Sequence, residues 1–190
     1  MSNLNIQKEK EKEKNLNLPN VLAAFRILLA PLMLWFMVDQ SNLIFEGWHP
    51  SWFDYFAGLI FVIASVTDFF DGYIARSWNQ MTKLGSILDP LADKMLVLAG
   101  FVGLLSMDRA SAFAIFLILS REFFITGLRV VAVAEGKSVA STMAGKIKTV
   151  VQMIAIGFLI MNWPFATELL WFAVFLTLYS GYEYIRDYLK

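Results

Sequence analysis

The chain has 190 residues, of which 58% are hydrophobic and 15% aromatic, and its equal numbers of basic and acidic residues leave no net charge. A mean hydropathy this positive is rare among soluble domains and indicates a membrane protein. The balanced charge gives no sign of a nucleic-acid partner. The absence of cysteine excludes disulfides, thiolate nucleophiles and cysteine-ligated metals.

The apolar sequence falls into six long runs, and we expect each run to form a helix that crosses the membrane. Most runs approach the roughly 20 residues that span the hydrocarbon. The second and third reach this length only with the neighbouring aspartates, as expected of helices whose polar groups face away from lipid. The runs cover about Val21–Val38, Trp52–Thr67, Met95–Met107, Ser111–Ala134, Met143–Asn162 and Thr167–Tyr182. The predicted fold is all-α, a polytopic membrane protein with six transmembrane helices and a short N-terminal interfacial segment.

The residues outside the runs are mostly polar. Residues 1–14 contain the alternating charges QKEKEKEK and are predicted to form a solvated or interfacial tail, followed by a single domain over residues 15–190. Asn17 or Asn20 can cap the first helix and Pro19 can begin it, so we expect this helix to enter the membrane near Asn20. Turn residues predict connections at Asp39–Ser51, Ser77–Ser86, Gly136–Ala144 and Asn162–Thr167.

Basic residues are distributed unevenly between these connections. With the N-terminus inside, the outer connections hold only one basic residue, Arg109, which lies between the third and fourth runs. The other basic residues of the tails and connections lie on the cytoplasmic side. Because cytoplasmic segments of membrane proteins carry an excess of Lys and Arg, this asymmetry predicts the orientation. Both termini are expected in the cytoplasm.

Four carboxylates lie at the predicted cytoplasmic ends of the second and third helices. Asp68 and Asp71 are three residues apart and Asp89 and Asp93 four, so each pair lies on one face of its helix. An ionised carboxylate is costly in a lipid-like medium unless it faces water, a partner or a metal. If the short connection folds the third helix back on the second, the four groups converge on a site for hard divalent cations such as Mg²⁺ or Mn²⁺.

Residues near the aspartates extend this interpretation. Gly72 and Gly85 leave room for a ligand or a close backbone, and Arg76 can reach an anion at the membrane surface. Carboxylates, glycines and cations together describe a cation-bridged phosphate site better than a proton relay. A single pair of aspartates is more often a solvated helix cap, but capping does not account for two pairs.

These residues resemble the signature D-x-x-D-G-x-x-A-R-x8-G-x-x-x-D-x-x-x-D of the CDP-alcohol phosphatidyltransferases. Its eight specified positions are matched at the same spacing by Asp68, Asp71, Gly72, Ala75, Arg76, Gly85, Asp89 and Asp93. The resemblance implies six spans and a site in which the four aspartates bind two divalent cations, Mg²⁺ or Mn²⁺. It further implies that Asp93 is both a ligand and the general base. A carboxylate base agrees with the sequence, since the only histidine, His49, belongs to an outer connection.

The resemblance also implies a lipid substrate with a CDP headgroup, which reacts with an alcohol to release CMP. By resemblance, the headgroup lies against Asp68, Gly72, Ala75, Arg76 and Gly85, and we add Asn20 to this set.

Charged residues inside the fourth predicted span bear on the identity of the alcohol. Arg121 and Arg129 are eight residues apart, near one face of a helix and about 12 Å apart along its axis. Lys146, at the start of the fifth span, adds a third cation. A surplus of positive charge beside a metal site favours an acceptor that itself carries phosphate.

Two structural alternatives stay open for these charges. Glu122 can form a structural ion pair with an arginine, for example Arg26. Lys146 and Lys148 can be anchors of the positive-inside type, an interpretation that suits Lys148 better than Lys146.

Three further segments, N-L-P-N, S-R-E-F-F-I-T-G-L-R and G-K-I-K-T, resemble the bacterial members of the family that make phosphatidylglycerophosphate. This implies CDP-diacylglycerol as donor and glycerol 3-phosphate as acceptor, with the acceptor phosphate held by Arg121, Arg129 and Lys146. It also implies a homodimer in the bacterial cytoplasmic membrane, surrounded by membrane lipid, with the active site facing the cytoplasm. One departure is Ala23, where these enzymes usually have threonine, although Arg26 is retained three residues later. Because alanine has no hydroxyl, whatever that threonine does for nucleotide or phosphate must be done here by Asn20, by water, or not at all.

Two rival functions remain at this point. The first is the same reaction with inositol phosphate, serine or a second phospholipid as acceptor. The second is a divalent-cation transporter, which would more often carry its carboxylates near the middle of the bilayer, on broken helices.

Overall fold

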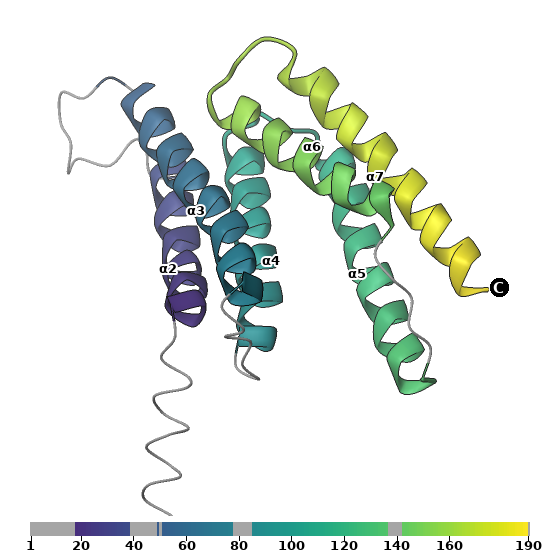
Figure 1. Ribbon diagram of the computed structural model, residues 1–190. Helices are drawn as coiled ribbons and strands as arrows, with labels where there is room; N and C mark the ends of the chain where they lie inside the picture. Colours follow the sequence, from purple (N-terminus) through teal and green to yellow (C-terminus); the bar gives the residue numbers. More distant parts are fainter. Residues whose placement is uncertain (1–17, 39–48, 50, 78–84, 137–141, 190) are drawn as a thin grey trace, which may run out of the picture. The chain divides into compact units, whose positions relative to one another are not determined.

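The computed structural model describes residues 18–38, 49, 51–77, 85–136 and 142–189, and in these ranges every regular element is an α-helix. Their side chains are described except at positions 19, 69–77, 86, 87, 89, 90 and 133. The helices are α2 (Leu18–Val38), α3 (Ser51–Ser77), α4 (Gly85–Ser106), α5 (Ala112–Ala134), α6 (Met143–Ile160) and α7 (Ala166–Tyr188) (Figure 1). The predicted all-helical fold is confirmed.

The helix bounds follow the apolar runs, with one informative difference. α3 continues past its apolar run to Ser77 and α4 begins ahead of its run at Gly85, so both aspartate pairs are helical. The shared helix face that their spacing predicts is therefore consistent with the backbone. The predicted N-terminal tail and most of the first three polar connections lie outside the described residues.

The chain forms two compact units, Met1–Gly103 and Leu104–Lys190. In the first unit, Arg26 near the start of α2 contacts Asp68 near the end of α3 and Asp93 near the start of α4. At the other end of α2, Phe36 stacks on Phe56 of α3 with ring centroids 5.5 Å apart. Thus α2 runs antiparallel to α3 and, by its contact with Asp93, brings α4 to the same end of the unit.

Small residues allow the helices of the first unit to approach closely. Buried residues recur every three or four positions along α2, and the buried residues of α3 include alanines. At Gly103 of α4, an added Cβ would lie 2.6 Å from Sδ of Met37, so this methionine would have to move for any larger residue. The buried face of α2 comprises Ala23, Arg26, Ala30, Met33 and Met37.

The second unit contains α5, α6 and α7, and its helices also alternate in direction. Nη1 of Arg109, before α5, donates to the carbonyl of Ile160 at the end of α6 over 2.7 Å, where a cation complements the helix C-terminus. At the other end, the Tyr188 hydroxyl of α7 donates to Glu135, which follows α5, over 3.1 Å. α6 therefore runs opposite to α5 and α7.

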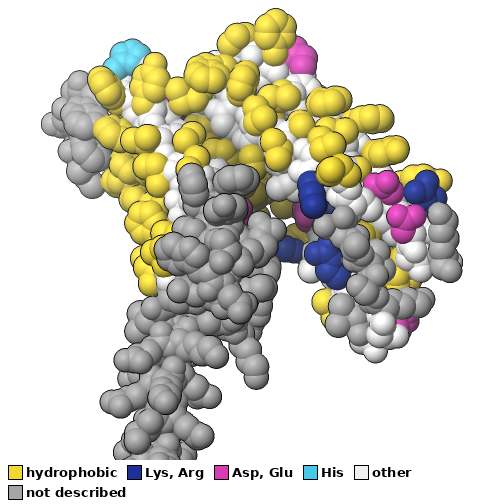
Figure 2. Space-filling model, in the orientation of Figure 1, with side chains coloured by type: hydrophobic (Ala, Val, Ile, Leu, Met, Phe, Trp, Pro, Cys, Tyr) yellow, Lys and Arg dark blue, Asp and Glu magenta, His cyan; other side chains and the backbone are white. Residues whose placement is uncertain are grey.

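Large apolar side chains cover much of the described surface seen in Figure 2. Leu28, Phe116 and Phe175, from three different helices, are 70%, 63% and 63% exposed. Apolar patches of this extent are unusual on soluble monomers and fit contact with lipid. Within the described ranges, two helical segments have the length and apolar composition to cross a membrane, Asn20–Val38 and Met143–Ile160.

Candidate active site

Arg26 lies at the centre of the polar end of the first unit. Its side chain is completely buried on the inner face of α2. Nη1 donates to Oδ1 of Asp68 on α3 and, over 3.0 Å, to Oδ1 of Asp93 on α4. One guanidinium nitrogen therefore brings together one carboxylate from each of the two predicted aspartate pairs.

The two carboxylates are more exposed than the arginine. The Asp68 side chain is 32% exposed and the Asp93 side chain 48%, so each has a side that solvent or a ligand can reach. Asp71 lies on α3 and Asp89 on α4, and their side chains lie outside those described. Among the described residues, no group of three or more metal-ligating side chains is present.

The donor chemistry of this end fits a divalent cation. Carboxylate oxygens are the preferred ligands of Mg²⁺ and Mn²⁺. Asp68 and Asp93 together carry more negative charge than one guanidinium neutralises.

The residues predicted to contact a CDP headgroup belong to the start of α2, the end of α3 and the start of α4. Asn20 is 5% exposed and lies in the first turn of α2. Gly85 is buried at the first position of α4. Gly72, Ala75 and Arg76 lie on the last turns of α3, and their surroundings lie outside the description.

Ala23, the position of the usual threonine, lies one turn before Arg26 on the same face of α2. Its side chain is completely buried. An alanine methyl cannot donate or accept a hydrogen bond, so this position adds only packing to the polar end of the unit.

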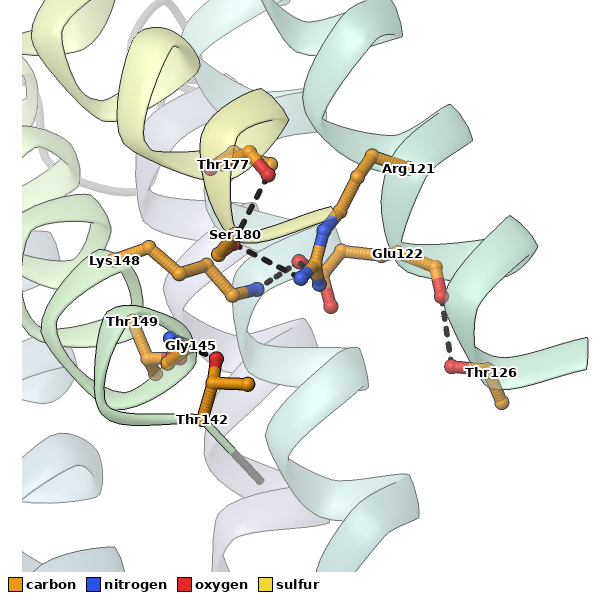
Figure 3. A network of polar contacts seen from close by, with 9 residues as sticks. All are labelled: Arg121, Glu122, Thr126, Thr142, Gly145, Lys148, Thr149, Thr177 and Ser180. Atoms are coloured by element: carbon orange, nitrogen blue, oxygen red, sulfur yellow. Dashed lines mark hydrogen bonds and ion pairs between the residues drawn. The ribbon is translucent and has the colours of Figure 1, made fainter. Parts of the chain in front are cut away.

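A second polar cluster lies inside the second unit and joins its three helices (Figure 3). Nη2 of Arg121 on α5 donates to Oγ of Ser180 on α7 over 2.9 Å, and Nη1 lies 3.4 Å from Oε1 of Glu122. The same Oε1 accepts a hydrogen bond from Nζ of Lys148 on α6. The side chains of Arg121 and Lys148 are 11% and 7% exposed.

The three residues predicted to hold an acceptor phosphate differ in their surroundings. Arg121 belongs to the buried cluster, whereas Arg129, two turns further along α5, is exposed and lies with Cζ 5.8 Å from the ring centroid of Tyr184. Lys146 is exposed in the first turns of α6. The alternative of an arginine–Glu122 pair is partly realised by Arg121, while Arg26 contacts Asp68 and Asp93 instead.

Sequence reasoning missed two members of the cluster. Lys148 was interpreted as a surface anchor, yet it is buried beside Glu122. Its spacing of four residues from Gln152, on the buried face of α6, was the available signal. Ser180 was not singled out, although it lies with Thr177 and Tyr184 on the buried face of α7.

Comparison of the sequence with known proteins identifies the family of this chain. The sequence model of the CDP-alcohol phosphatidyltransferase family matches residues 16–179. The chain is 43% identical over 180 residues to the CDP-diacylglycerol–glycerol-3-phosphate 3-phosphatidyltransferase of Bacillus subtilis, covering 88% of this chain and 93% of the relative. Proteins of the same name from Rickettsia typhi and Shigella flexneri are each 36% identical, covering 90% and 89% of this chain and 96% and 93% of their own length. The chain belongs to the CDP-alcohol phosphatidyltransferase family and is a transferase.

Proposed function

We propose that this protein transfers the phosphatidyl group of CDP-diacylglycerol to glycerol 3-phosphate, giving phosphatidylglycerophosphate and CMP. Family membership supports the transfer, and the names of the relatives support both substrates. The observation that carries the proposal is the convergence of Asp68 and Asp93, from separate helices, on one nitrogen of Arg26. Carboxylates from α3 and α4 must lie close together if they are to hold divalent cations at one phosphoryl-transfer site.

The four aspartates are the proposed ligands of two divalent cations, Mg²⁺ or Mn²⁺. Bound there, the cations would neutralise the diphosphate of the donor and the charge of the departing CMP. Asp68, Asp71 and Asp89 act as ligands, while Asp93 combines this with the function of general base. The carboxylate donor chemistry supports this assignment.

Asp93 accepts the proton of the 1-hydroxyl of glycerol 3-phosphate. The hydroxyl oxygen forms a bond to the phosphorus that carries diacylglycerol, and the bond from this phosphorus to the oxygen of CMP breaks. The 48% exposure of the Asp93 side chain supports access by the acceptor. His49 precedes α3, at the opposite end of this helix from Asp68, which argues against it as an alternative base.

The CDP headgroup is proposed to lie at the end of the first unit where these aspartates are. Its proposed contacts are Asn20, Asp68, Gly72, Ala75, Arg76 and Gly85. The burial of Asn20 and Gly85 at the starts of α2 and α4 supports a closely packed backbone near the headgroup. Arg76, on the last turn of α3, supplies a planar donor fork suited to a phosphate.

The acceptor phosphate is proposed to bind Arg121, Arg129 and Lys146. Two arginines near one face of α5 supply positive charge that serine or choline would not require. The exposure of Arg129 and Lys146 supports access from solvent.

The membrane arrangement is also a proposal. We infer six spans in the bacterial cytoplasmic membrane, a single domain over residues 15–190, both termini and the active site on the cytoplasmic side, and a homodimer. The alternating helix directions within each unit and the exposed apolar side chains support the spans. The distribution of basic residues supports the orientation.

The test is release of CMP by the purified protein from CDP-diacylglycerol. Separate reactions receive glycerol 3-phosphate, inositol phosphate, serine or a phospholipid, with and without a chelator. We expect release only with glycerol 3-phosphate, its loss on chelation and its return with Mg²⁺. Release with a different acceptor would reassign the substrate, and a protein that releases no CMP with any acceptor would overturn the assignment as a transferase of this kind.

A further inference from the structure

We propose that Ser180 and Gly181 of α7 are positioning residues that hold the guanidinium of Arg121 for the acceptor phosphate. The inference rests on the proposed function, in which Arg121 binds this phosphate. All the contacts that carry it lie within the second unit (Figure 3).

The hydroxyl of Ser180 has a fixed direction. Oγ donates its proton to the carbonyl of Thr177 over 3.0 Å, one turn earlier on α7. A hydroxyl has a single proton, so the lone pairs of Oγ remain for Nη2 of Arg121, which can only donate. Because Ser180 is completely buried, water does not compete for this bond. One end of the guanidinium is therefore held by a preoriented acceptor.

Gly181, next to Ser180 on α7, leaves the space that the side chain of Arg121 occupies. A Cβ at this position would lie 3.2 Å from both Cγ and Nε of Arg121. This separation is tighter than ordinary van der Waals contact, so the arginine would have to shift by a few tenths of an ångström. Only glycine lets α7 lie against the arginine stem at its present distance.

Lys148 forms an ion pair with Glu122, the acidic neighbour of Arg121. Oε1 of Glu122 bonds to Nζ of Lys148, while its distance from Nη1 of Arg121 is 3.4 Å. The lysine is thus the closer counter-charge of the glutamate. The positive charge of Arg121 is left less neutralised than in a simple Arg–Glu pair, as binding of an anionic acceptor requires.

The experiment measures the KM for each substrate and kcat in variants of the complete protein. In Ser180→Ala we expect the KM for glycerol 3-phosphate to rise about 10-fold, because a charge-assisted hydrogen bond is lost. The KM for CDP-diacylglycerol and kcat should change less than about 2-fold. Ser180→Thr keeps the hydroxyl and should restore most of the acceptor affinity.

Gly181→Ala separates positioning from folding. Alanine is a better helix former than glycine, which offsets part of the cost of the close contact with Arg121, and thermal unfolding of the variant checks that it folds. Its KM for glycerol 3-phosphate should nevertheless rise, because the guanidinium is displaced. Gly127→Ala on α5 is the matched control, since a Cβ there meets nothing within 4 Å. Ser65→Ala is the control for the hydroxyl, because Ser65 makes a comparable bond to the carbonyl of Phe61.

The outcomes distinguish this inference from the proposed function. If the parent protein releases no CMP with glycerol 3-phosphate, the acceptor assignment fails and the inference fails with it. If the parent is active but Ser180→Ala and Gly181→Ala keep the parental KM for glycerol 3-phosphate, only the positioning inference is overturned. Equal changes in the KM for both substrates would likewise overturn it.

Discussion

Arg26 donates from Nη1 to Oδ1 of Asp93 over 3.0 Å, although the two residues are 67 positions apart in the sequence. The same nitrogen bonds to Asp68, so a buried cation on α2 joins α3 to α4. The arginine is completely buried, whereas both carboxylates are partly exposed. The buried cation therefore contacts both carboxylates, and part of each carboxylate side chain remains exposed at the surface of the unit.

Arg26→Ala is expected to destabilise the protein most strongly when divalent cations are absent. Removing the buried arginine of this partly buried ion pair is expected to cost about 3 kcal/mol at most, or up to roughly 6–12 °C in Tm for a chain of this size. Saturating Mg²⁺ should recover part of the loss, because it neutralises the same carboxylates. The measurement is thermal unfolding in detergent, with chelator and with Mg²⁺.

Arg186→Ala is the control for this prediction. Arg186 pairs with the neighbouring Asp187, and both side chains are substantially exposed. Exposed pairs contribute about 0–1 kcal/mol, so we expect little change in Tm and no dependence on Mg²⁺. An equal loss of stability in Arg26→Ala with and without Mg²⁺ would contradict a shared role of arginine and cation.

Asp93→Asn is expected to abolish turnover while much of the metal binding remains. The amide oxygen can still accept from Arg26, but it cannot take a proton from the acceptor. Loss of a general base lowers kcat by about 10²- to 10⁴-fold. CMP release measures kcat, and the electron paramagnetic resonance spectrum of Mn²⁺ measures binding. A substantial residual rate would exclude Asp93 as the base, and Asp187→Asn, an exposed carboxylate, should behave as the parent.

The sequence predicted the helices, and the helical position of both aspartate pairs, because these depend on local periodicity. Apolar runs determine where helices form, and spacings of three and four residues put each aspartate pair on one face. The counter-charge of Asp68 and Asp93 was not predictable in this way. Arg26 reaches them only through the packing of three helices, and the partner that the sequence suggested for it was Glu122.

The second cluster was harder to predict for the same reason. Of the two lysines near the start of α6, the sequence favoured Lys148 as the positive-inside anchor, yet Lys146 is exposed and Lys148 is buried beside Glu122. Lys146 and Lys148 point in directions about 200° apart around the helix. Which of the two is buried depends on the side of α6 on which α5 lies. Ser180 and Gly181 gain their importance only from the arginine that packs on them.

Arg129→Ala is expected to raise the KM for glycerol 3-phosphate far more than the KM for CDP-diacylglycerol. Arg129 is exposed and lies over the Tyr184 ring, so its loss should cost little stability. Removing one charged contact to a phosphate corresponds to about 1.5–3 kcal/mol, or roughly 10- to 150-fold in KM. Steady-state kinetics with each substrate varied in turn measures both constants. Equal effects on the two substrates would argue against a site for the acceptor phosphate.

The Glu122–Lys148 pair can be tested by a double-mutant cycle with Glu122→Gln and Lys148→Met. Lys148→Met leaves Glu122 without its nearer counter-charge and should cost about 3 kcal/mol in the free energy of unfolding. The double variant should recover most of this loss, giving a coupling energy of about 2 kcal/mol. The exposed Arg186–Asp187 pair, treated in the same way, should couple by less than about 1 kcal/mol.

The same cycle has a kinetic consequence that stability alone does not predict. In Lys148→Met, Glu122 is free to neutralise Arg121, to which it already lies within 3.4 Å. The KM for glycerol 3-phosphate should therefore rise in this variant and return toward the parental value when Glu122→Gln removes the charge. Additive free energies of unfolding would show that the two side chains do not interact. If the KM instead stays high in the double variant, Lys148 contacts the acceptor itself and does not act by occupying Glu122.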